Sequence, residues 1–233
     1  MHVTLNHFIM KKRLLFFLLV VPMFFASCNT SKFFSRSAAD IRPIALVESY
    51  SYITDAVADF STDYLPDASR YNQLLITDVV NSLGMPVQKT VSVDYGVARP
   101  KSKLGSWMYH LVDLSAGSAK NLTVPDEIRD AVRESGCRYG LLITDVGYSK
   151  NANQYALEQG LEFATKVADF IINRNVDLSN DTEAHVNGVY SLIFDNQTGQ
   201  VVWYGKRPRR YEYDPLDHSS LMEQLTKLFA DFR

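Results

Sequence analysis

The sequence predicts an α/β or α+β domain, in which helices pack on a mixed β-sheet. Segments rich in β-branched and aromatic residues alternate along the chain with segments whose apolar residues recur at helical spacing. Turn-forming residues, mostly glycine and Asp-Pro, separate these segments. Residues 43–233 are numerous enough to build one self-sufficient core, so we expect a single domain there.

Five segments have the composition of strands, over residues 43–48, 87–95, 139–146, 186–194 and 201–204. Residues 87–95 alternate between apolar and polar side chains, as in a half-exposed strand, although Lys89 interrupts the apolar face. Residues 139–146 are almost continuously apolar, which favours a strand covered on both faces. The last two segments flank a turn that contains Gly199, and this pattern predicts a hairpin.

Four segments have helical spacing of apolar residues. One is expected to be capped by Asp67 or Ser69 and to end at Gly84, and another runs from Thr123 to Gly136. A third covers residues 153–174, within a possible helical insertion over 151–180. The last begins at Asp214-Pro215, and helix capping would account for both Asp214 and Asp217. Its apolar stripe consists of Leu221, Leu225, Leu228, Phe229 and Phe232. Residues 99–122 are ambiguous.

The N-terminus has the pattern of a signal peptide over residues 1–27. Three cations, Lys11, Lys12 and Arg13, precede the uncharged apolar run Leu14–Phe25. That run is too short for a spanning helix, which needs about 20 residues. The small residues Ala26-Ser27 follow it, as at a cleavage site.

The tetrapeptide Phe25-Ala26-Ser27-Cys28 resembles the lipobox of bacterial lipoproteins. The resemblance implies that Cys28 is acylated and becomes the new N-terminus, so that lipid holds the protein on a membrane without a spanning helix. Ordinary secretory cleavage near Ser27 is the alternative. Residues 28–42 are small and polar, and we expect them to be a tether. Because Asn29 is not the aspartate that retains such proteins in the inner membrane, we expect the outer membrane, facing the periplasm.

Charge and motifs exclude several classes of function. Without residues 1–27 the chain has 21 basic and 26 acidic residues, which gives no reason to expect nucleic-acid binding. The spacing of His110, His185 and His218 matches no metal motif, and the chain has no nucleophile elbow or phosphate loop. We therefore expect no metal, no cofactor and no catalytic residues. Cys137 has no intrachain partner once Cys28 is acylated, and we expect it to be buried.

One cluster of charge contrasts with the acidic background: Lys206, Arg207, Arg209 and Arg210 fall within five residues. Tyr204, Tyr211 and Tyr213 lie beside it. Such a cluster could bind an anionic partner, namely a lipid headgroup, a polysaccharide or an acidic protein patch. The pattern favours the alternative, a solvated edge strand whose charges prevent pairing with another chain.

Two pieces of the sequence together resemble the curli-secretion (CsgG) and penicillin-binding-protein-activator (LpoB) lipoproteins. One is the strand–helix–strand opening of a lipid-anchored domain, in which the helix runs into Gly84 and a strand follows. The other is the hairpin from Tyr190 to Gly205, with Asp195, Thr198-Gly199 and Val201-Val202-Trp203. The resemblance implies a small α/β domain that serves assembly or regulation in the cell envelope. It assigns no individual residue a role, and residues 151–180 have no counterpart in it. We therefore expect a non-catalytic binding or assembly accessory whose partner is an envelope protein or an anionic envelope polymer. A structural component of an outer-membrane complex and an enzyme of unrecognised type are the alternatives.

Overall fold

A computed structural model describes residues 32–56, 62–96, 102–149 and 185–232. The segment Ser31–Arg233 forms one compact unit. Its centre is an eight-stranded mixed sheet, in which β1, β8, β7, β6, β2 and β5 lie side by side in this order and β3 and β4 extend from β6. The strands are β1 (Lys32–Phe34), β2 (Ile44–Val47), β3 (Tyr50–Ala56), β4 (Thr62–Tyr64), β5 (Val87–Val91), β6 (Tyr139–Ser149), β7 (His185–Asp195) and β8 (Val201–Arg210).

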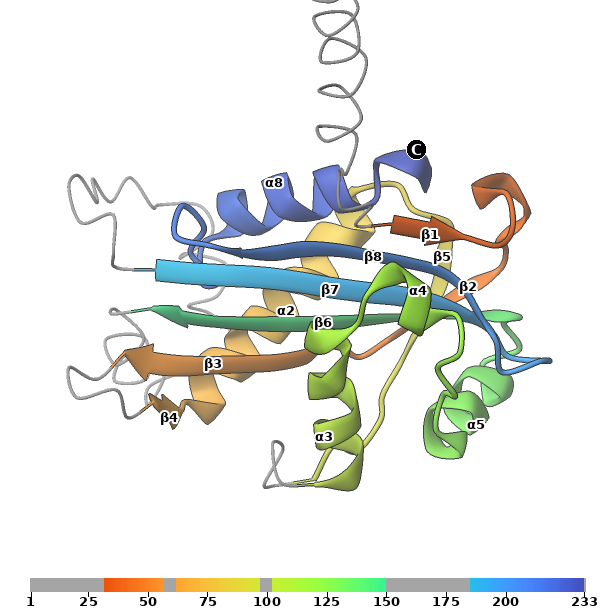
Figure 1. Cartoon of the computed structure of the whole chain (residues 1–233), viewed down its shortest axis with the longest axis horizontal. Helices are drawn as coiled ribbons and strands as arrows, with labels where there is room; N and C mark the ends of the chain where they lie inside the picture. Colours follow the sequence, from red (N-terminus) through yellow and green to blue (C-terminus); the bar gives the residue numbers. More distant parts are fainter. Residues whose placement is uncertain (1–31, 57–61, 97–101, 150–184, 233) are drawn as a thin grey trace, which may run out of the picture. The chain divides into compact units, whose positions relative to one another are not determined.

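Helices cover both faces of the sheet, which confirms the predicted fold class (Figure 1). One face carries α2 (Pro66–Ser82) and α8 (His218–Leu228), and the other carries α3 (Lys103–His110), α4 (Ala116–Ala119) and α5 (Asp126–Glu134). Side chains of β6 alternate between the two cores, since Leu141 packs with α2 and α8 while Leu142 packs with the other helices. Short 3-10 helices complete the chain: η1 (Ala38–Asp40), η3 (Leu111–Asp113) and η4 (Ala230–Phe232).

The β7–β8 hairpin confirms its sequence prediction. Gly199 has a φ of 70° in the turn, where a side chain would be strained. Asp195, fully buried, organises the turn: its Oδ1 accepts from the backbone N–H of Gln197 at 2.9 Å. Its Oδ2 meets two guanidinium groups, from Arg138 at 3.0 Å and Arg36 at 3.3 Å. The buried carboxylate is therefore paired with opposite charge, as a stable burial requires.

The predicted tether is wrong for residues 32–42, which belong to the fold. Strand β1 pairs antiparallel with β8, and Lys32 lies opposite Gly205. Ser37 caps η1, and Ile41 is completely buried. The small polar composition concealed these contacts because a three-residue edge strand has no recognisable periodicity. The expected domain start at residue 43 must accordingly move to Lys32.

Helix starts also differ from the prediction. Helix α2 begins at Pro66 after Leu65, and neither Asp67 nor Ser69 caps it; instead Ser69 Oγ accepts from the backbone N–H of Ile53 at 3.0 Å. Helix α5 begins at Asp126 rather than near Thr123. For α8, Asp217 alone is the N-cap, and its carboxylate accepts from Ser220 N at 2.8 Å. Proline at the first turn fixes the start of α2 without a side-chain cap.

Three further differences concern strands. Residues 50–56 form β3, which continues the path of β2 beyond Glu48-Ser49 and pairs parallel with the second half of β6. Strand β5 ends at Val91, four residues earlier than predicted, and β8 continues to Arg210, six residues later. The ambiguous residues include α3, η3 and α4. The predicted helix 153–174 and the insertion 151–180 lie outside the described residues.

Candidate functional site

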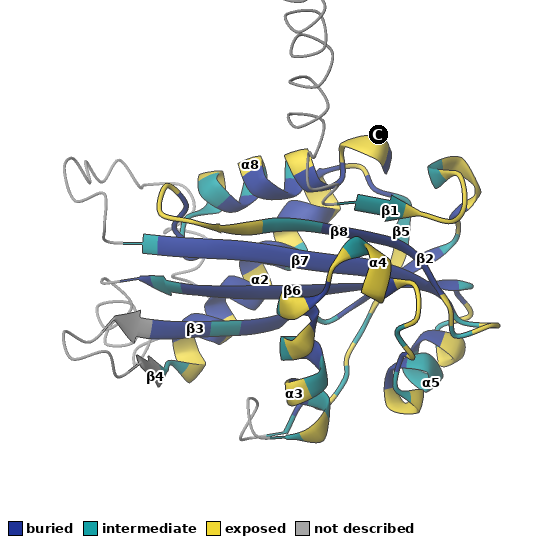
Figure 2. Ribbon diagram, viewed as in Figure 1, coloured by how far each residue is buried: buried dark blue, intermediate teal, exposed yellow. Residues whose placement is uncertain are grey.

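The basic cluster forms the outer half of β8. Burial falls along this strand from the fully buried Trp203 and Tyr204 to the exposed Pro208, Arg209 and Arg210 (Figure 2). On its inner side the segment pairs with β7 as far as Asn187, opposite Arg210. On its outer side β1 reaches only Gly205. Proline, which lacks a backbone donor, fits such an edge position.

The four cations do not share one face. Lys206 points to the face of α3 and α4, where its Nζ donates to Leu114 O at 2.9 Å. Arg209 lies on that same side, crossing Gly188 of β7 so closely that an added Cβ there would meet Arg209 Cγ at 2.9 Å. Because side chains alternate along a strand, Arg207 points to the opposite face, which α8 covers.

The four cations differ in whether a carboxylate of the fold lies at ion-pair distance. Arg210 pairs with Glu212 at 3.2 Å. The pKa of Glu223 on α8 is lowered chiefly by its hydrogen bond with Lys227 and then by Tyr213, and Arg207 adds a weaker attraction. Burial raises the pKa of Tyr190, and the nearby Arg209 opposes this rise. Within the described ranges neither Arg207 nor Arg209 has a carboxylate at ion-pair distance.

A buried polar network, which the sequence did not reveal, lies between the sheet and α2. Asn72 Nδ2 donates to Asp145 Oδ2 at 2.7 Å and lies 2.6 Å from the carbonyl oxygen of Pro215. Ser51 Oγ donates to Asn72 Oδ1. These residues come from β3, α2, β6 and the segment before α8, so the network joins four parts of the chain. No spacing in the sequence marks it, because Asn72 and Asp145 are 73 residues apart.

Burial raises the pKa of Asp145 to about 7, against an ordinary value of 3.8. The hydrogen bond from Asn72 offsets part of that rise, and so do the nearby Asn187 amide and the backbone N–H of Val146. The Asn187 amide acts from close by, although neither of its polar atoms reaches hydrogen-bond geometry. Asp145 Oδ1 also has no hydrogen-bond partner. A proton on that oxygen would remove the uncompensated charge, so the geometry favours a neutral Asp145.

Ser149, His185 and Asp214 come together at the far end of β6 and β7. Ser149 Oγ lies 3.0 Å from His185 Nδ1, and Asp214 Oδ2 lies 3.4 Å from the same nitrogen. A serine–histidine–carboxylate relay needs the serine and the carboxylate on different ring nitrogens, so that one takes a proton while the other orients the ring. Here the serine oxygen and the carboxylate oxygen both lie beside the same ring nitrogen, Nδ1 of His185. This is the geometry of a structural cluster.

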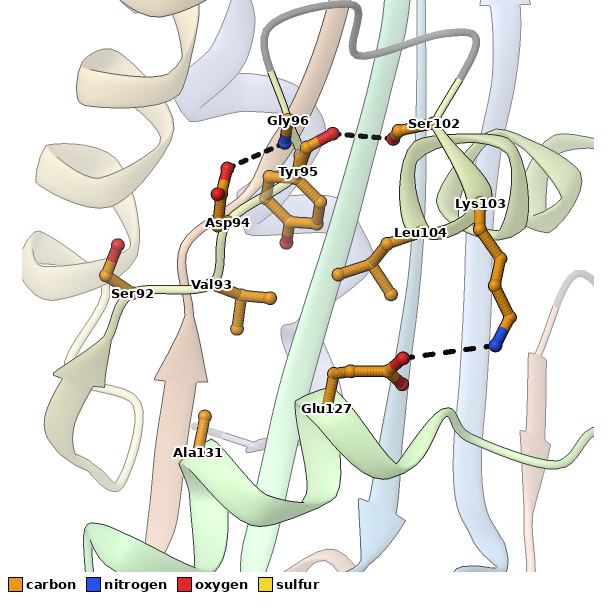
Figure 3. A pocket seen from close by; sticks show the side chains of 10 residues that line it. All are labelled: Ser92, Val93, Asp94, Tyr95, Gly96, Ser102, Lys103, Leu104, Glu127 and Ala131. Atoms are coloured by element: carbon orange, nitrogen blue, oxygen red, sulfur yellow. Dashed lines mark hydrogen bonds and ion pairs between the residues drawn. The ribbon is translucent and has the colours of Figure 1, made fainter.

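A hollow of about 460 Å³ opens between the end of β5, α3 and α5 (Figure 3). Lys103 and Glu127 face each other across its rim with 3.9 Å between Nζ and Oε1, and both side chains are largely exposed. Asp94 bends back to accept from the backbone N–H of Gly96 at 2.7 Å. Two serines line the hollow: Ser92 Oγ donates to Glu48 Oε2 at 2.5 Å, and Ser102 Oγ donates to the carbonyl oxygen of Tyr95 at 2.5 Å.

Three further observations concern the chemistry expected from the sequence. Cys137 is a free, buried cysteine, as predicted. In the described parts of the chain, no three histidine, cysteine or acidic side chains gather closely enough to hold a metal ion. No helix described here is long and apolar enough to cross a membrane. Cys28 and the predicted signal peptide lie outside the described residues.

Comparison with known proteins gives neither a family nor an activity. No protein-family model and no curated protein matches the sequence. Among solved structures, a point variant of the PelC dodecamer from Paraburkholderia phytofirmans is 14% identical with a TM-score of 0.38, covering 87% of this chain and 96% of that chain. A second PelC dodecamer from the same organism is 13% identical with a TM-score of 0.37, covering 86% and 94%. Sequence identities and TM-scores this low give no information about the function of this chain.

Proposed function

We propose that the chain is a lipid-anchored protein of the bacterial cell envelope, a binding or assembly accessory rather than an enzyme. Lipid on Cys28 would hold it on the periplasmic face of the outer membrane. The outer half of β8, with Lys206, Arg207, Arg209 and Arg210, would contact an anionic partner. The resemblance of the hairpin to envelope-assembly lipoproteins supports the same class of function.

The exposure of the outer half of β8 carries this proposal. The chain is acidic overall, yet this segment presents guanidinium groups that the fold does not use: Arg207 and Arg209 have no ion-pair partner in the described ranges. Guanidinium groups with free donors can bind carboxylates or phosphates by paired hydrogen bonds. Protection of a strand edge explains the charges as well, and only a binding experiment separates the two interpretations.

The alternative of an enzyme is favoured by one observation, the meeting of Ser149, His185 and Asp214. The shared Nδ1 argues against it, since the ring cannot both receive a proton from serine and be oriented by the carboxylate through one nitrogen. A structural component of an outer-membrane complex would co-purify with the other components in a fixed ratio at all salt concentrations. An accessory that binds through its charges would not. Charge-mediated binding weakens as salt rises.

Changing Arg207, Arg209 and Arg210 together to glutamine should reduce recovery of envelope partners and leave the fold intact. Surface substitutions usually change stability by less than about 0.5 kcal/mol each. Lys206 is excluded because its bond to Leu114 O makes it part of the fold, and its loss should cost about 1 kcal/mol. The measurement is co-purification of the full-length lipoprotein from its own envelope at low and moderate salt.

The matched control replaces three exposed arginines elsewhere, Arg42, Arg70 and Arg133, by glutamine, which makes the same change of net charge. We expect this control to recover partners like the unchanged protein. Equal recovery by the β8 variant and the control, at both salt concentrations, would contradict contact between this segment and an envelope protein or polymer.

A further inference from the structure

Strand β1 lies next to the point at which the basic segment, the outer half of β8 from Lys206 to Arg210, begins. Strand β1 runs antiparallel to β8, with Lys32 opposite Gly205 and Phe34 opposite Trp203. Gly205 is the residue immediately before Lys206. Followed backwards from Phe34 to Lys32, β1 therefore runs in the same direction as β8 does on its way to Arg210. The N-terminal end of β1 faces the side on which the cations lie.

Cys28 is only four residues before Lys32. An extended chain spans at most about 3.6 Å per residue, so the anchor can be no further than about 14 Å from Lys32. The basic segment extends over a similar length, since five residues of a strand cover about 17 Å. A lipid on Cys28 would thus hold the membrane surface close to β1 and the outer half of β8.

Cations surround this edge of the sheet on both of its faces. Lys120 of the short helix α4 lies 4.8 Å above the ring of Phe33 in β1, on the same face as Lys206. On the opposite face lie Arg207 and Lys32, of which Lys32 pairs with Asp231 at 2.6 Å. The acidic neighbours Glu212, Glu223 and Asp231 are each paired with a cation. Within the described residues, Lys120, Lys206, Arg207 and Arg209 have no carboxylate at ion-pair distance.

We infer that the outer half of β8, from Lys206 to Arg210, docks together with Tyr211 on anionic lipid headgroups of the bilayer that holds Cys28. This inference rests on the proposed acylation of Cys28. A planar surface that approaches the sheet edge-on meets side chains from both faces, whereas a polymer or a protein bound to one face would meet about half of them. Tyr211 is 67% exposed at the end of the segment, and tyrosine is favoured at the membrane–water interface.

Docking of this segment would determine how the domain is oriented on the membrane more than whether the protein stays there. Two or more acyl chains already make a stable anchor, and a basic segment beside them attracts anionic headgroups within about 10 Å. Strand β5 lies at the opposite edge of the sheet from β1 and β8. The hollow at the end of β5 would then point away from the bilayer, towards a partner in the periplasm.

A tryptophan reporter tests this orientation in the lipidated full-length protein. Tyr211→Trp places the reporter in the docking segment, and Gln88→Trp places it on the exposed opposite edge in β5. Each is compared with the parent protein, whose Trp107 and Trp203 supply the background. The protein is reconstituted in vesicles of brominated phosphatidylglycerol or of brominated phosphatidylcholine, since bromine quenches only tryptophan that it approaches closely.

We expect quenching of Tyr211→Trp by the anionic lipid, weak quenching by the zwitterionic lipid and none of Gln88→Trp by either. Adding the Arg207, Arg209 and Arg210 to glutamine changes should abolish the quenching at 211, while mass spectrometry still finds acylated Cys28. Equal quenching of both reporters, or quenching that survives the arginine changes, would overturn the docking. So would a reporter at 211 that responds to soluble polygalacturonate but not to anionic vesicles. An unmodified Cys28 would instead contradict the proposed function.

Discussion

A chain that lacks residues 215–233 should not fold. The deletion removes Leu221, Leu225, Leu228 and Phe229, each with no exposed surface, and Phe232, which is 6% exposed. Burial of such a side chain contributes roughly 1.5–3 kcal/mol, against a total stability of about 5–15 kcal/mol for a domain of this kind. The deletion also uncovers Trp203, which packs on Phe229 and Phe232 at ring distances of 5.4 and 5.3 Å. Circular dichroism and thermal melting would show the loss of a cooperative transition.

A point substitution separates loss of packing from the effects of truncation. Leu225→Ala removes one fully buried side chain of α8 and should lower the free energy of unfolding by about 2–5 kcal/mol. Its control is Leu74→Ala on α2, where the side chain is 41% exposed, and the expected change is below about 0.5 kcal/mol. A truncated chain that melts near the midpoint of the full chain would mean that α8 is peripheral to the core.

Asp145→Asn should stabilise the protein increasingly as the pH rises from 4 to 7. The pKa of the folded state, about 7, lies above the ordinary value of 3.8, so the folded chain binds the proton more tightly than the unfolded chain. Well below pH 3.8 the carboxyl is protonated in both states and has no effect on stability. Between these values the unfolded chain releases the proton first, and the native state loses stability by up to about 4 kcal/mol.

The asparagine has no charge to bury, and its oxygen can still accept from Asn72 Nδ2. The difference in unfolding free energy between Asp145→Asn and the parent protein, measured in urea at several pH values, isolates this effect. Asp113→Asn is the control, because that side chain is 72% exposed. A difference that stays constant from pH 4 to pH 7 would show that Asp145 is not held in its neutral form.

The sequence predicted the elements that are continuous and strongly patterned. The hairpin was recognisable from the turn residues around Gly199 between two apolar segments, and α8 from apolar residues that recur at helical spacing. Strand β3 was not recognised, since its tyrosine, serine and threonine residues owe their burial to β6, α2 and α3 rather than to a local pattern. The early end of β5 likewise depends on a distant strand, since Val91 lies opposite Val47, the last residue of β2.

The features of the candidate site also differ in whether the sequence could predict them. The cations of β8 could be found because they are adjacent in the chain, but their division between two faces depends on the register with β7. The network of Ser51, Asn72 and Asp145 joins residues that are far apart, and only the packing of α2 on the sheet brings them together. The position of β1 was hidden for the same reason, because its pairing with β8 spans 173 residues from Lys32 to Gly205.

Mass spectrometry of the mature N-terminus is the most direct measurement of the proposed membrane anchoring. We predict an N-terminal Cys28 that carries acyl chains, with residues 1–27 absent. Cys28→Ala should remove the acceptor thiol and prevent acylation, so that the lipid-modified peptide disappears. An unmodified N-terminus at any other residue in the membrane fraction would contradict the lipid anchor.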